Sequence, residues 1–282
     1  MITLRLQGGL GNQMFAYATA KSLAERNHTS LVLDINAFKY DSLRHFELDK
    51  YNIDAIVTDK FYFFKKTIRK LSLERFFSNY YVEKSLLYDD NLYKNVSDSL
   101  YLEGYFQSEK YFKNRREKLL EEFCIKGELS SYTQEVALKI KASPMSISLH
   151  IRRGDYVANE QTQAIHGSTP LSYYKKSMLY LEERFGDVEY FIFSDDIEWV
   201  QENLKIQNAI YVKNDRERIP HEDIYLMSLC HHNIIANSSF SWWGAWLNNY
   251  DKKIVIAPKR WFVDEKLYQQ SKDIVCESWI QL

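Results

Sequence analysis

Two adjacent arginines, Arg152 and Arg153, follow the apolar run 146–151, which predicts a buried strand. Arginine is always protonated, and its planar fork of N–H donors matches two phosphate oxygens at a time. Ligands of open α/β sheets bind at the carboxyl ends of the strands, which is where this pair lies. The pair is therefore a candidate clamp for a diphosphate, and surface arginines with Asp155 as a salt-bridge partner are the alternative. His150 is expected on the same side as Arg152, either contacting a ligand or buried as a structural residue.

Two other predicted strands in this half of the chain also end in polar clusters. The segment Ser194-Asp195-Asp196 follows the strand predicted at 188–193. Its carboxylates either accept hydrogen bonds from a ribose or a guanine, or cap the next helix. Hydroxyl and amide groups at 237–241 stand where another helix is predicted to begin, which favours an anion site or, again, a cap. The predicted ligand-binding residues of this half are His150, Arg152, Arg153, Ser194, Asp195, Asp196, Asn237, Ser238, Ser239 and Phe240.

A glycine-rich turn lies near the N-terminus, between a predicted strand at 2–6 and a predicted helix at 12–25. Counted from Gly9, the spacing of a dinucleotide-binding loop reaches Gly11 and then Met14. The third glycine is absent, so a Rossmann-type cofactor is disfavoured. Glycines at this turn still allow a ligand to approach the backbone closely.

Strands and helices alternate along the chain, which predicts an α/β protein with two halves. The first half opens as strand, turn, helix and strand, the pattern that builds parallel sheets, and the break at 142–144 ends its last helix. We therefore expect one domain at 1–143 and a second at 144–282, facing a cleft. The expected strands are 2–6, 30–35, 99–103, 146–151, 188–193, 209–212, 232–236 and 253–257, and the expected helices are 12–25, 109–123, 131–142, 171–184, 196–204, 221–230 and 241–248.

Composition restricts the class of protein. The chain has 37 basic and 38 acidic residues, so no overall field attracts it to nucleic acid. Three widely spaced cysteines argue against a disulfide framework and fit a reducing compartment. The sequence contains no signal peptide and no apolar run near the roughly 20 residues that a membrane helix needs. We therefore expect a soluble, cytoplasmic protein.

Two conspicuous groups of side chains are predicted to be structural. The run Cys230-His231-His232 lacks further ligands at a spacing suited to a metal ion. Trp242, Trp243 and Trp246 could stack on a sugar, but on a helix that follows a polar loop they are expected to fill the core. No metal site is predicted.

Three motifs lie in a fixed order along the chain: GGLGNQMF at 8–15, HIRRGDY at 150–156 and SSFSWWGAW at 238–246. Together they resemble the signatures of the α-1,2-fucosyltransferases of glycosyltransferase family 11, and the resemblance spans almost the whole chain. It implies a GT-B architecture, in which two Rossmann-like α/β domains form an acceptor-facing N-terminal half and a donor-binding C-terminal half. It also implies inverting transfer of L-fucose from GDP-β-L-fucose to a galactose 2-hydroxyl, without a metal or another cofactor.

The resemblance also suggests partners. The chain is similar in length to bacterial members that modify O-antigen or capsule units, which implies a galactose-terminated oligosaccharide or a lipid-linked glycan as acceptor. The basic aromatic stretch 60–84 either touches a membrane-bound acceptor, at the inner membrane face, or forms a solvated helix face. Two alternatives remain open: a GT-B transferase of another nucleotide sugar, and a non-catalytic protein that binds a guanine nucleotide or a glycan.

Residue roles follow by position from the resemblance. Arg152 matches the phosphate-binding arginine of related fucosyltransferases, so it is expected to stabilise charge on the leaving phosphate, with Arg153 in support. Glu160 lies where the α-1,6 enzymes carry a catalytic glutamate, and Asp155 is its rival as general base. Asn12 matches an acceptor-facing asparagine of the protein O-fucosyltransferases. The predicted acceptor and cleft residues are Gly9, Gly11, Asn12 and Gln13.

Overall fold

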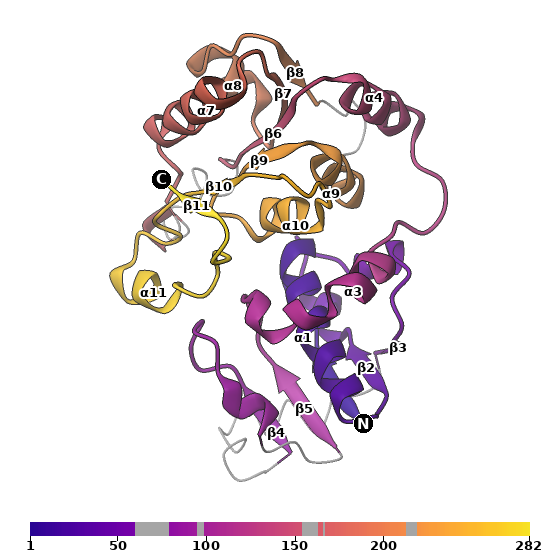
Figure 1. Ribbon diagram of the computed structural model, residues 1–282. Helices are drawn as coiled ribbons and strands as arrows, with labels where there is room; N and C mark the ends of the chain where they lie inside the picture. The colour runs from indigo at the N-terminus through magenta and orange to yellow at the C-terminus, as the bar shows by residue number, and fades with distance from the viewer. Residues whose placement is uncertain (60–78, 95–98, 154–162, 166, 213–218) are drawn as a thin grey trace. The chain divides into compact units, whose positions relative to one another are not determined.

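The chain divides into two α/β units (Figure 1). The computed structural model describes residues 1–59, 79–94, 99–153, 163–165, 167–212 and 219–282. Unit 1 contains Met1–Lys126 with Lys272–Ile274, and unit 2 contains Gly127–Ser271 with Val275–Leu282.

The chain passes from unit 1 to unit 2 earlier than the sequence predicted. The predicted boundary at residue 143 left helix α4 (Ser131–Ala142) in the first half, but the division lies before this helix. Val136 and Ile140 of α4 are buried in a core cluster that contains Phe193 of unit 2. Because the apolar face of α4 packs against these side chains, the helix belongs to unit 2.

The described residues of unit 1 form a five-stranded sheet in the order β3-β2-β1-β5-β4, with every pair parallel. The central strands are apolar and buried, as parallel strands covered on both faces must be. Helix α1 begins at the carboxyl end of β1 and leads back to the amino end of β2. The elements are β1 (Ile2–Arg5), α1 (Leu10–Arg26), β2 (Leu31–Asp34), β3 (Ile56–Thr58), β4 (Tyr80–Val82), β5 (Leu100–Glu103) and α3 (Arg116–Glu122).

In unit 2, the part of the chain that the structure describes forms a six-stranded parallel sheet in the order β11-β10-β9-β6-β7-β8. Read from β8, this is the strand order 3-2-1-4-5-6 of the doubly wound dinucleotide-binding fold. The elements are α4, β6 (Ser146–Ile151), α7 (Leu171–Phe185), β7 (Glu189–Ser194), α8 (Ile197–Asn203), β8 (Ala209–Tyr211), α9 (Pro220–Leu229), β9 (His232–Ile234), α10 (Ser239–Leu247), β10 (Val255–Ala257), α11 (Glu265–Gln270) and β11 (Ile280–Gln281).

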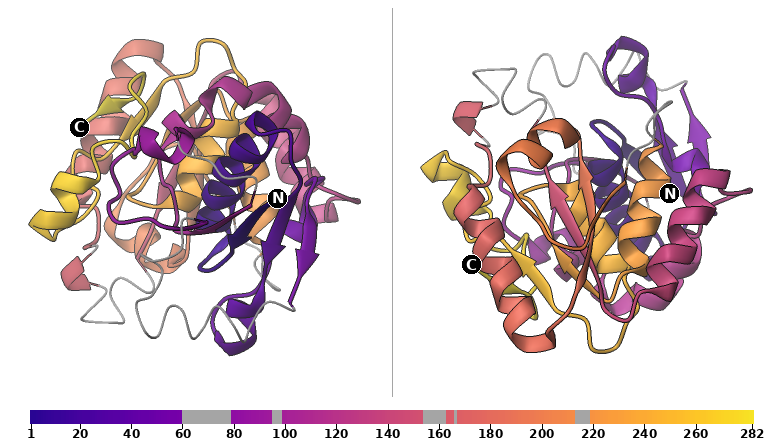
Figure 2. Two further views of the ribbon diagram at one scale, coloured as in Figure 1. Left: turned by 90° about the horizontal axis from the view of Figure 1, so that it is seen from below. Right: turned by 90° about the horizontal axis from the view of Figure 1, so that it is seen from above.

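Alternate side chains of the central strands of unit 2 pack on opposite faces of the sheet. Ile147 and Leu149 belong to a cluster with residues of α7 and α8, whereas Phe191 and Phe193 pack with residues of α4 and α9. Figure 2 shows these helices on the two sides of the sheet. The period of two along each strand therefore produces a three-layer unit.

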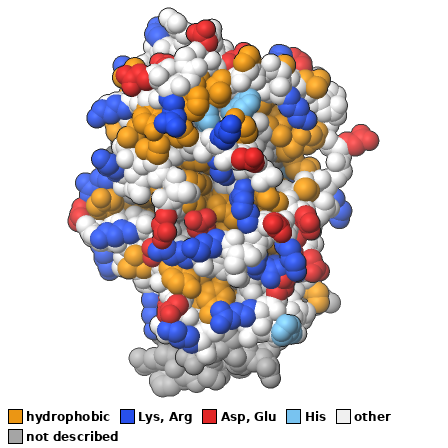
Figure 3. All heavy atoms as spheres, in the orientation of Figure 1, with side chains coloured by type: hydrophobic (Ala, Val, Ile, Leu, Met, Phe, Trp, Pro, Cys, Tyr) orange, Lys and Arg blue, Asp and Glu red, His pale blue; other side chains and the backbone are white. Residues whose placement is uncertain are grey.

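Two properties of the surface and the helices bear on partners. In the part of the chain that the structure describes, no helix is both long and apolar enough to cross a membrane. Basic and acidic side chains are interspersed over the face drawn in Figure 3, in keeping with the nearly equal numbers of 37 and 38.

Candidate active site

The three polar strand ends predicted in the second half are neighbours in the sheet of unit 2. Strand β6 lies between β9 and β7, and its last residue, Ile151, pairs with Ser194 of β7. Beyond β6 the chain builds the sheet outward through β7 and β8, then returns to place β9 on the other side. The carboxyl ends of β6 and β9 therefore form a topological switch point, where ligands bind in this class of sheet. Arg152 follows β6, and Asn237 and Ser238 follow β9.

Arg153 is held in place by the segment that follows β7. Its backbone N–H donates to Asp195 Oδ1 at 2.8 Å, and its Nε lies 3.3 Å from Asp196 Oδ2. The guanidinium carbon lies 3.5 Å from the ring centroid of Trp199, a cation–π contact. Because its guanidinium stacks on Trp199 and pairs with Asp196, Arg153 is anchored to the segment after β7. Arg152, the residue before it, is half-buried.

Asp196 caps helix α8, which was the structural alternative for this pair of carboxylates. Its Oδ1 accepts from the Trp199 N–H at 3.2 Å, and its own N–H donates to Ser194 Oγ at 3.0 Å. Asp195 accepts from the backbone of Arg153. Both carboxylates thus organise the loops around the arginine pair, and their contact with a ribose or guanine remains a prediction.

Asn237 connects the loop after β9 to two other loops of unit 2. It is buried, and its Nδ2 donates to the carbonyls of Gly167 at 3.2 Å and Trp261 at 3.1 Å. Its Oδ1 accepts from the Thr169 hydroxyl at 2.9 Å. The Asn237 side chain therefore joins these loops from inside unit 2, and its predicted contact with a ligand stays a prediction. No sequence pattern pointed to these partners, because 167–169 and 261 lie far from 237 along the chain.

Helix α10 begins at the switch point. Ser238 is its N-cap, with Oγ accepting from the Phe240 N–H at 3.3 Å, and Ser239 opens the helix. A helix N-terminus carries partial positive charge and presents N–H donors to an anion. Trp242 and Trp243 are fully buried further along α10, which confirms that they fill the core.

His150 lies inside unit 2. It is 2% exposed, and its ring centroid is 5.7 Å from that of Phe240. This burial agrees with the structural interpretation of His150, and the predicted ligand contact stays a prediction. The two candidate bases, Asp155 and Glu160, lie outside the described residues.

The glycine turn of unit 1 begins helix α1 earlier than predicted. Gly8 has a φ of 79°, in the left-handed region that favours glycine, and Gly9 is the N-cap of a helix that starts at Leu10. Gly11 and Asn12 therefore stand in the first turn of the helix, at the carboxyl end of β1. The half-buried Asn12 accepts from Gln107 Nε2 at 2.7 Å. This hydrogen bond joins the residues after β1 and β5, the switch point of this sheet.

Gln13, which was predicted among the acceptor-facing residues, is buried inside unit 1. It is 0% exposed, and its Nε2 donates to the carbonyls of Gly8 at 2.9 Å and His45 at 2.7 Å. Its Oε1 accepts from the Glu47 N–H at 3.0 Å. All the hydrogen-bonding groups of this amide are thus used to fix the glycine turn and the segment 45–47.

Glu83 is a residue of this edge that sequence reasoning missed. It follows β4, and its carboxylate accepts from the N–H groups of Tyr105 at 2.7 Å and Phe106 at 2.9 Å. Burial raises the pKa of Glu83 to about 7, against the opposing effect of these two hydrogen bonds. A Cβ at Gly104 would lie 2.5 Å from the Glu83 Cβ, which explains the glycine. No signal pointed to Glu83, because the short strand β4 was not predicted.

The run Cys230-His231-His232 has structural roles. Cys230 is buried, which raises its thiol pKa, and His231 Nδ1 accepts from the Ser146 N–H at 3.1 Å. His232 Nδ1 accepts from the Ile254 N–H at 2.9 Å, and burial lowers the pKa of His232 to about 4. Among the described residues, no group of three or more His, Cys, Asp or Glu side chains could hold a metal ion.

The model of the family described as "Glycosyl transferase family 11" matches residues 1–282. The chain belongs to this family. It is 39% identical over 300 residues to an α-1,2-colitosyltransferase of Escherichia coli, covering 100% of this chain and 99% of the relative. It is 36% identical over 305 residues to the O-antigen biosynthesis glycosyltransferase WbnK of E. coli, covering 98% and 99%.

A solved structure supports the architecture. The fucosyltransferase NodZ from Bradyrhizobium superposes with a TM-score of 0.53 at 15% identity, over 86% of this chain and 91% of that chain. At this identity the likeness establishes the fold, which is of the GT-B type. This member of family 11 is thus a glycosyltransferase with two α/β units, each built on a parallel sheet, as predicted.

Proposed function

We propose that this family 11 glycosyltransferase transfers L-fucose from GDP-β-L-fucose to the 2-hydroxyl of a terminal galactose, with inversion at the sugar carbon. The observation that carries the proposal is the position of Arg152 at the switch point of unit 2, between the ends of β6 and β9. The three sequence motifs that resemble α-1,2-fucosyltransferases support the choice of sugar and linkage. The acceptor is an oligosaccharide or a lipid-linked glycan, and in the lipid-linked case the enzyme works in the cytoplasm against the inner membrane face.

The chemistry requires that negative charge on the leaving β-phosphate be stabilised. Arg152 offers a fixed positive charge and a two-donor fork at the end of β6, and the N-terminus of α10 adds N–H donors beside it. Arg153, stacked on Trp199, positions Arg152 instead of contacting the phosphate. These groups supply positive charge in the place where other transferases use a cation, so the proposed reaction needs no metal.

The acceptor hydroxyl must lose a proton as it attacks. Glu160 and Asp155 are the proposed bases, since a carboxylate can take the proton on the face opposite the leaving phosphate. Asn12, at the switch point of unit 1, is proposed to orient the acceptor, because an amide can hold a hydroxyl but cannot accept its proton at neutral pH. Gly9 and Gly11 leave room for a sugar to approach the backbone there.

Replacing Arg152 tests the proposal. We expect Arg152→Ala to lower turnover of GDP-fucose with a galactoside acceptor by at least about 100-fold, the usual cost of one transition-state donor. Arg152→Lys should recover only part of the loss, because lysine lacks the planar fork. Arg153→Ala is the matched control and should be milder. Alanine variants of Arg152 with near wild-type rates would contradict the phosphate assignment.

A second donor is favoured by one observation, the 39% identity to an α-1,2-colitosyltransferase. Colitose is fucose without the 3-hydroxyl, so the two donors differ by one hydrogen-bonding group. Initial rates with GDP-fucose, GDP-colitose and GDP-mannose, each with a panel of galactose-terminated oligosaccharides, identify the sugar. A binding protein without activity would bind these nucleotides and turn over none of them.

A further inference from the structure

Unit 1 contains a large pocket that none of the predicted site residues lines. Its volume is about 1040 Å³, at the upper end of small-molecule sites. The last turns of α1, from Lys21 to Arg26, form one wall, and the residues 28–30 that lead into β2 form another. We call this the basic pocket.

The basic pocket is distant from the proposed acceptor edge within the same unit. Helix α1 begins at the carboxyl end of β1, where Asn12 lies, and ends at the amino end of β2. Arg26 lies 14 positions after Asn12 along the helix, which is about 20 Å at 1.5 Å per residue. A ligand in the basic pocket would therefore not occupy the acceptor edge.

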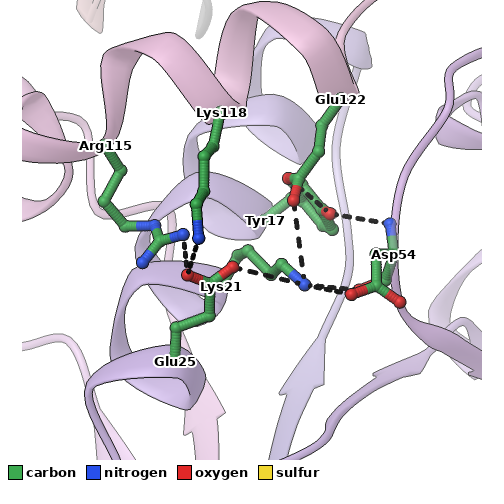
Figure 4. Close-up of polar contacts among 7 residues, drawn as sticks. All are labelled: Tyr17, Lys21, Glu25, Asp54, Arg115, Lys118 and Glu122. Carbon is green, nitrogen blue, oxygen red and sulfur yellow. Dashed lines mark hydrogen bonds and ion pairs between the residues drawn. The ribbon is translucent and has the colours of Figure 1, made fainter.

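Positive charge dominates the lining of the pocket. Six Lys and Arg side chains line it together with His28, against two carboxylates, Glu25 and Asp54. Figure 4 shows part of this cluster, where helix α1 faces the segment from η6 (Lys113–Arg115) into α3. The six basic residues are Lys21, Arg26, Lys110, Lys113, Arg115 and Lys118.

Some of these charges are neutralised inside the unit. Lys21 Nζ lies 2.6 Å from Asp54 Oδ2, 3.5 Å from Glu25 Oε1 and 3.7 Å from Glu122 Oε1. Arg115 pairs with Glu25, and Lys110 Nζ lies 2.6 Å from Asp273 Oδ1. These pairs attach α1 and α3 to the loops beside them, as ion pairs in many folds do.

The remaining cations exceed what this structural role needs. Arg26 lies over the ring of Tyr93 at 5.2 Å, and Lys118 shares Glu25, which Arg115 already engages, at 3.6 Å. Lys118 is 67% exposed, and Lys113 is exposed with no ion pair among the described residues. Four carboxylates thus pair with four of the six Lys and Arg side chains. Positive charge therefore remains in excess at the pocket.

An aromatic wall completes the pocket. Tyr88 and Tyr93 both pack on Tyr111, with ring centroids 4.7 Å and 6.2 Å apart. Aromatic faces accept the apolar faces of organic groups, while Arg and Lys side chains bind phosphate oxygens. The combination fits an anion of two or more charges that is attached to an organic group.

We propose that the basic pocket binds a diphosphate ester, with the diphosphate on Arg26, Lys113 and Lys118 and the organic part on the tyrosine wall. The ligand is distinct from the nucleotide sugar at the switch point of unit 2. A free diphosphate and a diphosphate at the surface of a lipid membrane share this chemistry. The proposal does not depend on which sugar the enzyme transfers.

The test uses the full chain with Arg152→Ala, so that the proposed donor site contributes as little as possible. Inorganic pyrophosphate is titrated by calorimetry into this protein and into the same protein with Lys113→Gln and Lys118→Gln. We expect the two lysine substitutions to weaken pyrophosphate binding at least about tenfold, because charge-assisted contacts to phosphate are lost. Both lysines are exposed, so the fold should be retained, which circular dichroism checks.

The matched control removes two lysines of unit 1 that do not line the pocket, Lys39→Gln and Lys50→Gln, with the same change in net charge. Its affinity should stay within about twofold of the background protein. Three results would overturn the proposal: an unchanged affinity in the Lys113 and Lys118 variant, an equal loss in the control, or no binding in the Arg152→Ala background.

Vesicles distinguish the two sources of ligand. Phosphatidylcholine vesicles with and without a polyprenyl diphosphate are sedimented with each protein. Binding that needs the polyprenyl diphosphate, is competed by pyrophosphate and is lost in the Lys113 and Lys118 variant assigns the pocket to a membrane-anchored ligand. Pyrophosphate binding without vesicle binding assigns it to a soluble diphosphate.

Discussion

Unit 1 should become less stable as the pH rises toward neutrality, because Glu83 then loses the proton that it holds in the folded protein. Burial raises the pKa of this carboxyl from 4.5 to about 7 in the folded protein, although the N–H groups of Tyr105 and Phe106 favour its ionised form. Near pH 6 the folded protein therefore holds a proton on Glu83 that the unfolded chain has released. Stability falls with pH wherever the native state binds more protons, so the contribution of Glu83 is complete below about pH 4.5 and is lost as the pH rises through about 7.

The size of the effect follows from the shift. A rise in pKa from 4.5 to about 7 corresponds to roughly 3 kcal/mol as an upper bound, at 1.36 kcal/mol per unit. Within this window the free energy of unfolding should fall by about 1 kcal/mol per pH unit because of this one group. Glu83→Gln removes the titration and keeps the shape of the side chain.

Urea unfolding of the wild type and of Glu83→Gln at pH 5.5, 6.5 and 7.5, at constant ionic strength, measures this difference. Subtracting the variant from the wild type removes the titration of all other groups. Glu117→Gln, the same carboxylate-to-amide change at an exposed position of unit 1, is measured in parallel as the matched control. A wild-type minus Glu83→Gln difference that is flat or increases with pH would refute the argument, since it would mean that the two N–H donors outweigh burial.

Three other outcomes are expected. Activity should survive millimolar EDTA, because the proposed mechanism assigns the positive charge at the leaving phosphate to Arg152 and the start of α10; loss of activity on chelation, restored by manganese, would count against this. Arg153→Ala and Trp199→Ala should each lower the free energy of unfolding by about 1 kcal/mol, since they remove the same cation–π contact, and denaturant unfolding that separates the two variants widely would disagree. Of Glu160→Gln and Asp155→Asn, the one that removes the true base should lower turnover at neutral pH while calorimetry shows unchanged GDP affinity; if Asp155→Asn loses GDP affinity, that residue supports the arginine loop, and if both turn over normally, neither is the base.

Most strands of unit 2 could be predicted, because a strand that is buried on both faces has a nearly continuous apolar sequence. The run 146–151 matches β6 at both ends, and 131–142 matches α4. Strands β3 (Ile56–Thr58) and β4 (Tyr80–Val82) were missed, since each has three residues and a half-buried or exposed surface. Short edge strands carry little periodicity, so their existence depends on the neighbouring strand that they pair with.

The helix predicted at 109–123 was only partly correct. The chain forms two short 3₁₀ turns, η5 (Glu109–Tyr111) and η6 (Lys113–Arg115), before α3 begins at Arg116. Ser108 caps the first turn by accepting from the Lys110 N–H at 3.3 Å, and Phe112 is fully buried between the two turns. Burial of Phe112 in the core of unit 1 overrides the local helical preference, which a sequence pattern cannot anticipate.

The candidate site was predictable to the extent that strand ends are. The polar residues Arg153 and Asp196 follow two consecutive strands, so the sequence could place them at strand ends. It could not predict that Arg153 stacks on Trp199. The partners of Gln13 are different, since His45 and Glu47 come from a loop 32 and 34 residues away. A glutamine beside a glycine turn has the same sequence signature whether it faces a ligand or the interior.

Sheet order decides which of the polar strand ends share a site. Along the chain, the segment after β9 is the third of the three polar clusters, and sequence alone does not say whether it lies beside the first or the second. The pairing of Leu149 with Ile234 places β9 directly against β6, on the side opposite β7. Arg152 and the start of α10 therefore flank the switch point, whereas Asp195 and Asp196 lie on the other side of β6 and hold Arg153. The topology thus explains why Arg153 is anchored by the segment after β7, and a separate phosphate-binding role for the adjacent Arg152 is what the proposed function predicts.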